Sequence, residues 1–429
     1  MKFAHNASYT LLLGLMILVL ASCRDKQKEV VTYTANVPVY TDIEGFRSSI
    51  NAEPAKSLTE TGKLYLWSDY IFINRPYEGV HIIDNSEPSA PRNIAFLPIP
   101  GNVDVAVKAG NLYADSYVDL LVFDLSDVNK PVLIKRLEEV YPTALPPTKN
   151  EYPIAQVDRE QGVVTGWTVE VVTEEREPNA APAGPLWENA DVTFTSAEVN
   201  TAAASPSATA GTSGSMARMA IYNDHLYSVS EEHLQVFDIT SPANPIEGKR
   251  IELRSSGVET IFPFNDHLLL GTTTGMLVYA LPDPAHPGYI STMWHVRSCD
   301  PVVAEGDWAY VTLRGNGRCG TSPSSLDVID ISNMQSPRLQ YSFTMEEPYG
   351  LGIDDGTLFV CDGNAGLKVY DATDPSAITN NMLAHFSNIN TFDVIPHNNL
   401  LLMIGADGLY QYDYSDPTNL LLLSSIPTN

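Results

Sequence analysis

A short apolar strand, ended by aspartate in six of its seven copies, recurs along this chain and constrains the fold more than any other feature. One copy is Leu121-Val122-Phe123-Asp124, whereas the copy from Leu277 to Ala280 ends in alanine. The remaining copies end at Asp84, Asp238, Asp330, Asp371 and Asp413. Neighbouring copies lie 40 to 50 residues apart, with one longer gap between 124 and 238. A regular period of this length indicates stacked units that share one continuous core.

Each unit is predicted to contain four short β-strands. In the unit at 258–296, the first two strands are Val258–Phe264 and His267–Gly271, separated by an Asn-Asp turn. The apolar strand that ends at Ala280 follows, and a last strand ends at Trp294. β-Branched and aromatic residues favour strands, and Gly, Asn, Asp and Pro favour the turns between them. No stretch after residue 50 has sustained helical periodicity, which excludes parallel sheets with crossover helices.

Seven four-stranded units predict an all-β fold, a seven-bladed β-propeller over residues 62–429. An open β-solenoid usually has much shorter rungs, and two packed sandwiches would not repeat so regularly. We expect the ring to close between the first and seventh blades. The expected blades are 62–101, 102–140, 216–254, 255–296, 297–345, 346–387 and 388–429.

Two segments lie outside the repeats. Residues 23–61 are predicted to form a tether and a short lead-in, with one helix near Ile43 to Ile50. The second segment, 141–215, is an insertion between blades two and three, and its first part, up to residue 172, is predicted to be a partly ordered extension. Residues 196–215 are almost entirely Ala, Ser, Thr and Gly. Such sequence has too little apolar bulk to offset the entropy lost on ordering, so we expect disorder at about 175–214.

The N-terminal residues predict export. Lys2 precedes a nearly continuous apolar run, Leu11 to Leu20, which is too short to read as a membrane span. The sequence Leu20-Ala21-Ser22-Cys23 resembles the lipobox of bacterial lipoproteins, in which the cysteine is acylated and becomes the new N-terminus. This resemblance implies a signal peptide at 1–22 and a lipid anchor on Cys23. An ordinary signal peptide followed by an incidental cysteine is the alternative.

The charge balance excludes one class of partner. The chain has 25 Lys and Arg against 52 Asp and Glu, a formal net charge of −27. So acidic a surface repels phosphate backbones, which argues against nucleic-acid binding. It also opposes electrostatic docking on anionic lipid, so membrane attachment would depend on the lipid anchor.

Export also permits disulfides. Cys299 and Cys319 flank the central strands of one repeat, and we predict a bridge between them. Cys361 ends an apolar strand and is predicted to be a free, buried thiol. A metal site at the cysteine pair is the rival interpretation, but no histidine accompanies the pair at ligand spacing. We therefore expect neither a metal nor a cofactor.

The repeat resembles the LVIVD repeat family, propeller-like bacterial repeats named for a Leu-Val-Ile-Val-Asp strand. The strongest copies are Leu120–Asp124, Leu326–Asp330 and Leu367–Asp371, each followed two positions later by Ser or Thr. Together with the lipobox, the resemblance implies an LVIVD-repeat lipoprotein of the Bacteroidetes type. Because that family is mostly uncharacterised, the resemblance implies fold and location rather than activity.

The recurring aspartates are predicted to be structural. Ser or Thr follows two residues after most of them, an arrangement in which the aspartate accepts turn-forming hydrogen bonds. The sequence has no Gly-x-Ser-x-Gly, phosphate-binding loop, His-Glu-x-x-His or EF-hand spacing. Asp362 to Gly366 is too short for a calcium loop and is predicted to be a hairpin turn.

Residues that the repeats do not share point to one face of the ring. In a propeller, the entries to all first strands surround one mouth of the central channel. Counting back from each first hairpin turn places at this mouth Asp104, Arg218, Thr260, Asp300, Gly350 and Phe392, with Glu259 and Asp393 adjacent. The insertion 141–215 emerges on the same face. The carboxylates could bind a cation or a basic ligand, and a hydrated mouth without a ligand is the alternative.

These observations predict a non-catalytic binding or scaffolding module for a partner protein, lipid-anchored at the outer membrane, with the leaflet undecided. The rival is a hydrolase or lyase that uses mouth carboxylates such as Asp104 and Asp300, which would have to lie within about 10 Å of each other. A third interpretation is a surface lipoprotein that binds glycans through exposed aromatic rings such as Trp308 and Tyr349. The sequence leaves catalytic activity undecided.

Overall fold

The computed structural model describes residues 29–48, 50–149, 152–176, 210–230, 232–255, 257–295, 301–315 and 323–428. The predicted signal peptide and four residues singled out above, Cys23, Cys299, Asp300 and Cys319, lie outside these ranges. The chain divides into two compact units, one of residues 1–41 with 147–191 and one of 42–146 with 192–429. Within the described ranges, no helix is long and apolar enough to cross a membrane.

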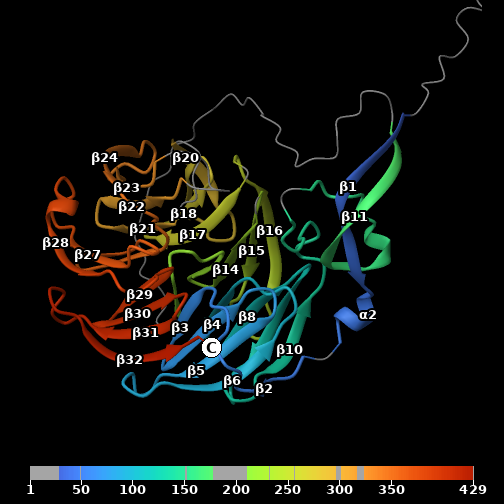
Figure 1. Cartoon of the computed structure of the whole chain (residues 1–429), viewed down its shortest axis with the longest axis horizontal. Helices are drawn as coiled ribbons and strands as arrows, with labels where there is room; N and C mark the ends of the chain where they lie inside the picture. Colours follow the sequence, from blue (N-terminus) through green and yellow to red (C-terminus); the bar gives the residue numbers. More distant parts are fainter. Residues whose placement is uncertain are drawn as a thin grey trace, which may run out of the picture. The chain divides into compact units, whose positions relative to one another are not determined.

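The larger unit is a seven-bladed β-propeller of four-stranded antiparallel blades, as predicted (Figure 1). The first three blades are β3 (Leu64–Trp67), β4 (Tyr70–Arg75), β5 (Gly79–Asp84) and β6 (Arg92–Pro98); β7 (Val105–Lys108), β8 (Asn111–Ser116), β9 (Asp119–Asp124) and β10 (Val132–Leu137); and β13 (Met219–Tyr222), β14 (His225–Val229), β15 (His233–Asp238) and β16 (Ile246–Glu252). The fourth and fifth are β17 (Val258–Phe264), β18 (His267–Thr272), β19 (Gly275–Ala280) and β20 (Gly288–Trp294); and β21 (Val302–Glu305), β22 (Trp308–Leu313), β23 (Ser325–Asp330) and β24 (Arg338–Thr344). The last two are β25 (Leu351–Asp354), β26 (Thr357–Cys361), β27 (Leu367–Asp371) and β28 (Met382–Phe386); and β29 (Asp393–His397), β30 (Leu400–Gly405), β31 (Gly408–Asp413) and β32 (Leu421–Pro427).

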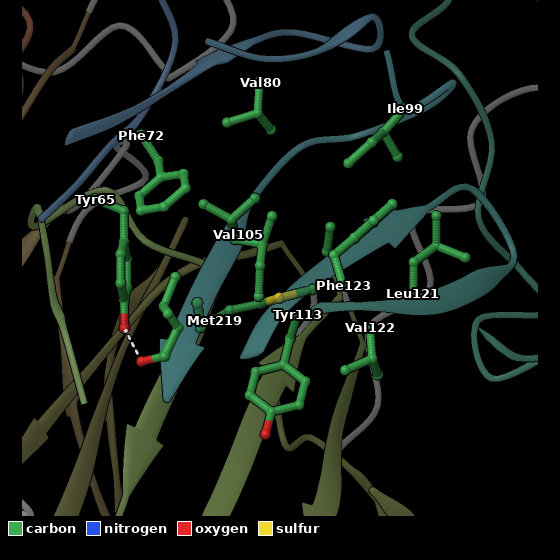
Figure 2. Close-up of a cluster of buried hydrophobic side chains, with 14 of the residues drawn as sticks. Tyr65, Phe72, Val80, Ile99, Val105, Tyr113, Leu121, Val122, Phe123 and Met219 are labelled. Atoms are coloured by element: carbon green, nitrogen blue, oxygen red, sulfur yellow. Dashed lines mark hydrogen bonds between the residues drawn. The ribbon is translucent and has the colours of Figure 1, made fainter. Parts of the chain in front are cut away.

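The core lies between the blades. The two middle strands of each blade are almost wholly buried, and their apolar side chains pack against those of the next blade. Figure 2 shows one such cluster, with Phe72 of the first blade, Tyr113 and Phe123 of the second and Met219 of the third. The hydroxyl of Tyr65 donates across it to the carbonyl of Val107, 3.3 Å away. Removing this apolar surface from water contributes about 25 cal/mol per Å² and holds neighbouring blades together.

The ring closes by packing between the first and seventh blades. Leu64 and Ile73 share a buried cluster with Ile395 and Leu402, and β3 lies beside β29 (Figure 1). The amide nitrogen of Gln411 also donates to the side-chain oxygen of Asn85 at 2.7 Å. The closure expected from the sequence is thus made by side chains, and each blade supplies its own four strands.

The recurring aspartates form turns at the end of the third strand, as predicted. In each of the six copies that end in aspartate, a carboxylate oxygen accepts from the backbone N–H two residues ahead, in the pairs Asp84–Ser86, Asp124–Ser126, Asp238–Thr240, Asp330–Ser332, Asp371–Thr373 and Asp413–Ser415. The Ser332 side chain and backbone hydrogen bonds lower the pKa of Asp330 from its ordinary value, because they favour the charged carboxylate. These turns lie at the face opposite the entries to the first strands.

The lead-in to the propeller is ordered and begins with a short helix. Helix α2 (Ile43–Phe46) is capped by Asp42, whose carboxylate accepts from the Gly45 N–H at 2.8 Å. Arg47 follows and bonds the fully buried Asp119 through two nitrogens, at 2.9 and 3.0 Å. The strand β2 (Glu53–Pro54) then pairs with the outer edge of the first blade. The helix is shorter than the predicted Ile43 to Ile50, and the lead-in is held on the second blade by ion pairs.

The smaller unit contains a two-stranded antiparallel ribbon. Strands β1 (Glu29–Thr41) and β11 (Val163–Arg176) pair along their whole length, and a short turn of 3₁₀ helix, η1 (Arg159–Gln161), precedes β11. The buried side chain of Asn36 donates to the carbonyls of Lys149 and Tyr152, both at 2.8 Å, and so holds the loop between the strands. Residues 29–41, which fall within the predicted tether and lead-in at 23–61, form the first strand of this ribbon. Their pairing partner lies more than 100 residues away, beyond the reach of a local pattern.

Candidate functional site

A segment of the insertion runs through the centre of the propeller. Ala210 bridges to Lys108, and the Gly211 N–H donates to the carbonyl of Val107 in the second blade at 3.1 Å. The next residues form strand β12 (Thr212–Ser213), which pairs with the innermost strand of the first blade, β3. We call residues 210–217 the plug, because they occupy the space inside the ring of first strands.

The plug goes on to join three further blades. The Ser215 hydroxyl donates to Asp393 of the seventh blade at 3.1 Å and accepts from the Leu351 N–H of the sixth at 2.9 Å. The Ala217 carbonyl then accepts from the Ile261 N–H of the fourth blade at 2.9 Å. The chain next enters the third blade at Met219. One short segment therefore ties blades one, two, four, six and seven together at their inner edge.

Two glycines make this close approach possible. A β-carbon on Gly211 would lie 2.3 Å from the carbonyl oxygen of Leu66, and one on Gly214 would lie 2.0 Å from a carboxylate oxygen of Asp393. Both distances are far inside van der Waals contact, so a larger residue at either position would displace backbone or a buried carboxylate. The prediction of disorder up to residue 214 is therefore wrong at 210–214, and it is also wrong at 175–176, which belong to β11. Small residues that cannot build a core of their own fit a narrow channel lined by unpaired strand edges.

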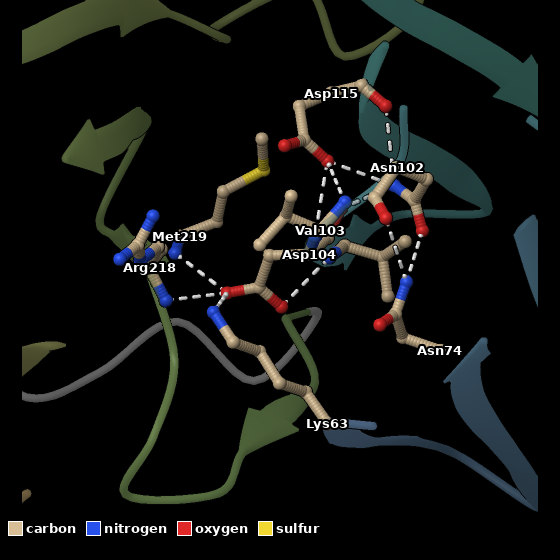
Figure 3. A network of polar contacts seen from close by, with 9 residues as sticks. Lys63, Asn74, Asn102, Val103, Asp104, Asp115, Arg218 and Met219 are labelled. Carbon is tan, nitrogen blue, oxygen red and sulfur yellow. Dashed lines mark hydrogen bonds and ion pairs between the residues drawn. The ribbon is translucent and has the colours of Figure 1, made fainter. Parts of the chain in front are cut away.

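Asp104 lies beside the plug and is buried, with 2% of its surface exposed (Figure 3). One carboxylate oxygen accepts from the backbone N–H of Arg218, from that of Met219 at 2.9 Å, and from Nζ of Lys63 at 3.4 Å. The other oxygen accepts from its neighbour Val105 at 2.8 Å. Asp104 thus joins the first three blades, and its oxygens are occupied by the fold.

Asp115 supports the loop that carries Asp104. Its Oδ1 accepts from the N–H groups of Val103 and Asp104, at 2.8 and 2.9 Å, and from Nδ2 of Asn102 at 2.8 Å (Figure 3). Burial raises the pKa of Asp115 to about 6, although these hydrogen bonds act in the opposite direction.

Asp393 occupies the corresponding place at the seventh blade, with 1% of its surface exposed. It accepts from the Ser215 hydroxyl and, at 3.0 Å, from the Val394 N–H. Burial raises the pKa of Asp393 to about 6, against the lowering effect of these hydrogen bonds. Both Asp104 and Asp393 are therefore part of the frame around the plug.

A cavity of about 230 Å³ opens above the plug at the entries to the first strands. Six of the seven blades contribute residues to it, from positions at which the repeats differ from one another. Its lining consists of Lys63, Tyr77, Val103, Met216, Arg218, Glu259, Thr260, Pro301, Arg314, Pro348 and Tyr349. Burial lowers the pKa of Lys63, with the nearby Arg218 acting in the same direction and Asp104 opposing it.

One wall of the cavity is aromatic. The guanidinium of Arg314 lies 3.9 Å from the centre of the Tyr349 ring, and the ring of Phe392 lies 5.3 Å from that of Tyr349. Trp308 is distant from this wall, because it begins β22 opposite Asp330 at the other face. The two aromatic residues considered for glycan binding are therefore not brought together.

The structure brings some of the predicted site residues together at the mouth and buries others beneath it. Arg218, Glu259 and Thr260 line the cavity, whereas Asp104 and Asp393 lie buried beneath it. Asp300 is outside the described residues. Of the carboxylates considered for a cation or a basic ligand, Asp104 and Asp393 accept hydrogen bonds from backbone N–H groups of the first strands, and Glu259 lines the cavity. In the same ranges, no group of three or more His, Cys, Asp or Glu is placed to hold a metal.

Sequence reasoning missed Lys63 and Arg314. The count that places Asp104 six residues before its hairpin turn also places Lys63 six residues before Asp69 in the first blade, so the signal for Lys63 was present. Arg314 follows a second strand, at a position where the other blades share no residue type. No repeat-based signal marks it.

Comparisons with known proteins support the fold. Residues 297–345, the predicted fifth blade, match the LVIVD repeat. The periplasmic gluconolactonase PpgL of Pseudomonas aeruginosa is similar over 89% of this chain and 97% of its own, with a TM-score of 0.50 and 10% identity. A protein from Lactobacillus plantarum (89% and 97% covered, TM-score 0.49, 12% identity) and BamB from Moraxella catarrhalis (91% and 92%, 0.41, 10%) are also similar. A search of curated proteins finds no match. At 10% identity, the similarity to PpgL shows the propeller fold alone.

Proposed function

We propose that this propeller is a non-catalytic binding or scaffolding module that engages a partner protein through the face carrying the cavity. The observation that carries the proposal is the plugged channel. The plug fills the channel at one level and hydrogen-bonds five blades, which stiffens this face, and residues of six blades line the cavity above it. A rigid surface loses little conformational entropy on association, which favours stable binding.

The state of the carboxylates argues against acid–base catalysis at this mouth. A glycosidase-type pair needs two carboxyl groups that both reach the substrate. Asp104 accepts four hydrogen bonds from its own fold and Asp393 is held by Ser215 and Val394. Neither side chain lines the cavity. The residues that do line it are cationic, aromatic or apolar, apart from Thr260 and the acidic Glu259.

The proposal places the protein at the cell envelope. Acylation of Cys23 would anchor it to a bilayer, most directly the outer membrane, because each buried methylene contributes about 0.8 kcal/mol. A Cys299–Cys319 bridge would fit the same oxidising compartment. Replacing Cys23 with serine is expected to move the protein from the membrane to the soluble fraction, and protease treatment of intact cells would tell surface from periplasm.

Affinity purification of the tagged full chain from solubilised membranes tests the partner. Arg218→Glu reverses a charge in the cavity, and Arg338→Glu makes the same reversal at the start of β24, at the opposite face. We expect a specific co-purifying protein to be lost with Arg218→Glu and retained with Arg338→Glu. Recovery of the wild-type protein alone, or equal loss with both variants, would contradict the proposal.

A further inference from the structure

The cavity at the channel mouth carries charge opposite to that of the protein as a whole. The chain has a net charge of −27, yet the lining contains three cations, Lys63, Arg218 and Arg314, and one acid, Glu259. Grouping like charges costs free energy, and more so where protein replaces part of the surrounding water. Burial is the main cause that lowers the pKa of Lys63, Asp104 opposes it, and the nearby Arg218 adds a smaller lowering effect, so the two cations lie close to each other. A bound anion would offset this repulsion.

The rest of the lining can contact the uncharged part of a ligand. Met216, Val103, Pro301 and Pro348 present apolar groups, and Tyr349 presents a ring that is stacked with Arg314. Ligand sites typically combine a mostly apolar lining with a few polar groups that orient the ligand. The volume of about 230 Å³ is below the roughly 300–1,000 Å³ of sites for drug-sized molecules, so the occupant is small.

We propose that this cavity binds a small organic anion, with a carboxylate or phosphate head beside Lys63 and Arg218 and a planar or apolar body against Tyr349 and Met216. The Lys63 ammonium has three N–H donors and gives one to Asp104, so it can bond the head group without leaving the carboxylate. The guanidinium of Arg218 matches the planar geometry of either head group. This inference does not depend on the protein partner, and either proposal can fail alone.

Titration calorimetry with compounds that share one body tests the charge of the head. Benzoate and phenyl phosphate are the two anionic probes, benzamide is the neutral one and benzylammonium the cationic one. We expect at least one anion to bind, more weakly as salt is raised, while benzamide and benzylammonium do not bind. Binding of benzoate alone would assign a carboxylate head, and binding of phenyl phosphate alone a phosphate head.

Matched arginine variants test the position. Arg218→Gln is expected to weaken binding of the anion at least tenfold, as removal of a charged hydrogen-bond donor does. Arg338→Gln removes an exposed arginine at the opposite face and is expected to leave the affinity unchanged. Urea unfolding checks that both variants keep the wild-type midpoint. Three outcomes would overturn the proposal. Neither anion binds up to about 10 mM, a free energy of binding weaker than about −3 kcal/mol; or benzamide binds as well as the anions; or Arg218→Gln and Arg338→Gln lose the same affinity.

Discussion

Replacing Asp104 by asparagine should destabilise the propeller far more than its conservative size suggests. The carboxylate lies beside the plug with 2% of its surface exposed and accepts four hydrogen bonds from three blades. An asparagine keeps one oxygen and turns the other acceptor into an NH₂ donor. In either orientation, that NH₂ group faces at least one buried N–H donor, that of Val105 or that of Met219.

The size of the effect follows from the contacts. A hydrogen bond to a charged group contributes about 1.5–3 kcal/mol, and breaking a buried charged pair by removing one partner costs about 3–5 kcal/mol. Because Lys63 is partly exposed and 3.4 Å away, most of the loss comes from the N–H groups of Val105, Arg218 and Met219. Since one or two of these charged hydrogen bonds would be lost, at about 1.5–3 kcal/mol each, we expect Asp104→Asn to lower the free energy of unfolding by about 3–5 kcal/mol.

Urea unfolding followed by tryptophan fluorescence measures this loss as a shift in midpoint. Asp124→Asn is the matched control in the same blade, because its carboxylate makes one turn hydrogen bond, to the Ser126 N–H at 2.8 Å. An asparagine can accept that bond, so the control should lose less than about 1 kcal/mol. If Asp104→Asn were no less stable than Asp124→Asn, the proposed role of Asp104 in joining three blades would be refuted.

Three further predictions follow from the plug and the buried groups. Gly214→Ala should lower the urea midpoint, because its β-carbon would lie 2.0 Å from Asp393, while Gly288→Ala, which has open space around it, should not; equal midpoints would contradict the geometry of the plug. Asp393 has a pKa of about 6 in the folded state, above the value of about 3.9 in the unfolded chain. Between these pH values the folded state binds more protons than the unfolded state, so the contribution of Asp393 to stability falls as pH rises from 4 to 6. Asp393→Asn should remove up to about 3 kcal/mol of that fall, whereas Asp413→Asn, whose folded pKa is lowered, should leave it unchanged; unfolding curves at pH 4, 5, 6 and 7 compare them. Maleimide should not label Cys361 in the native protein, because the thiol is buried and burial raises its pKa. After unfolding without reductant, a Cys23→Ser protein should show one reactive thiol if the proposed Cys299–Cys319 bridge is present, and three if it is absent.

The repeat period was enough to predict the propeller, because each blade is local in sequence. Four consecutive strands separated by short turns pair with one another, so the pattern around Asp124 or Asp371 reports its own structure. The same locality explains why the turn role of these aspartates was predicted: the bond runs between residues two positions apart.

Contacts between distant segments were not predicted, because local sequence patterns do not identify a partner far along the chain. The pairing of β1 with β11 and of β12 with β3 joins residues more than 100 positions apart, and neither segment has a pattern that names its partner. The plug is small and polar, so its composition resembles that of disordered chains. Its order comes from the unpaired edge of β3 and from Asp393, which are visible only once the ring is closed.

The sequence pattern identified some of the residues that line the cavity, but not the depth at which each side chain lies. Counting from the hairpin turns located the mouth, and Arg218, Glu259 and Thr260 do line the cavity. The count does not reveal depth, so it could not separate Arg218, which faces the cavity, from Asp104, which turns inward to the backbone N–H groups of the third blade.

Hydrogen exchange of the plug tests the account most directly, since the plug both closes the channel and forms the floor of the cavity. The amides of Gly211 and Gly214 donate to Val107 and Leu64, and β12 pairs with β3. In the native protein, peptides covering 210–217 should therefore exchange as slowly as those covering β3, and Gly214→Ala should speed exchange in both. Exchange of 210–217 at the rate of an unstructured chain, with β3 still protected, would contradict the plugged channel and the binding surface built on it.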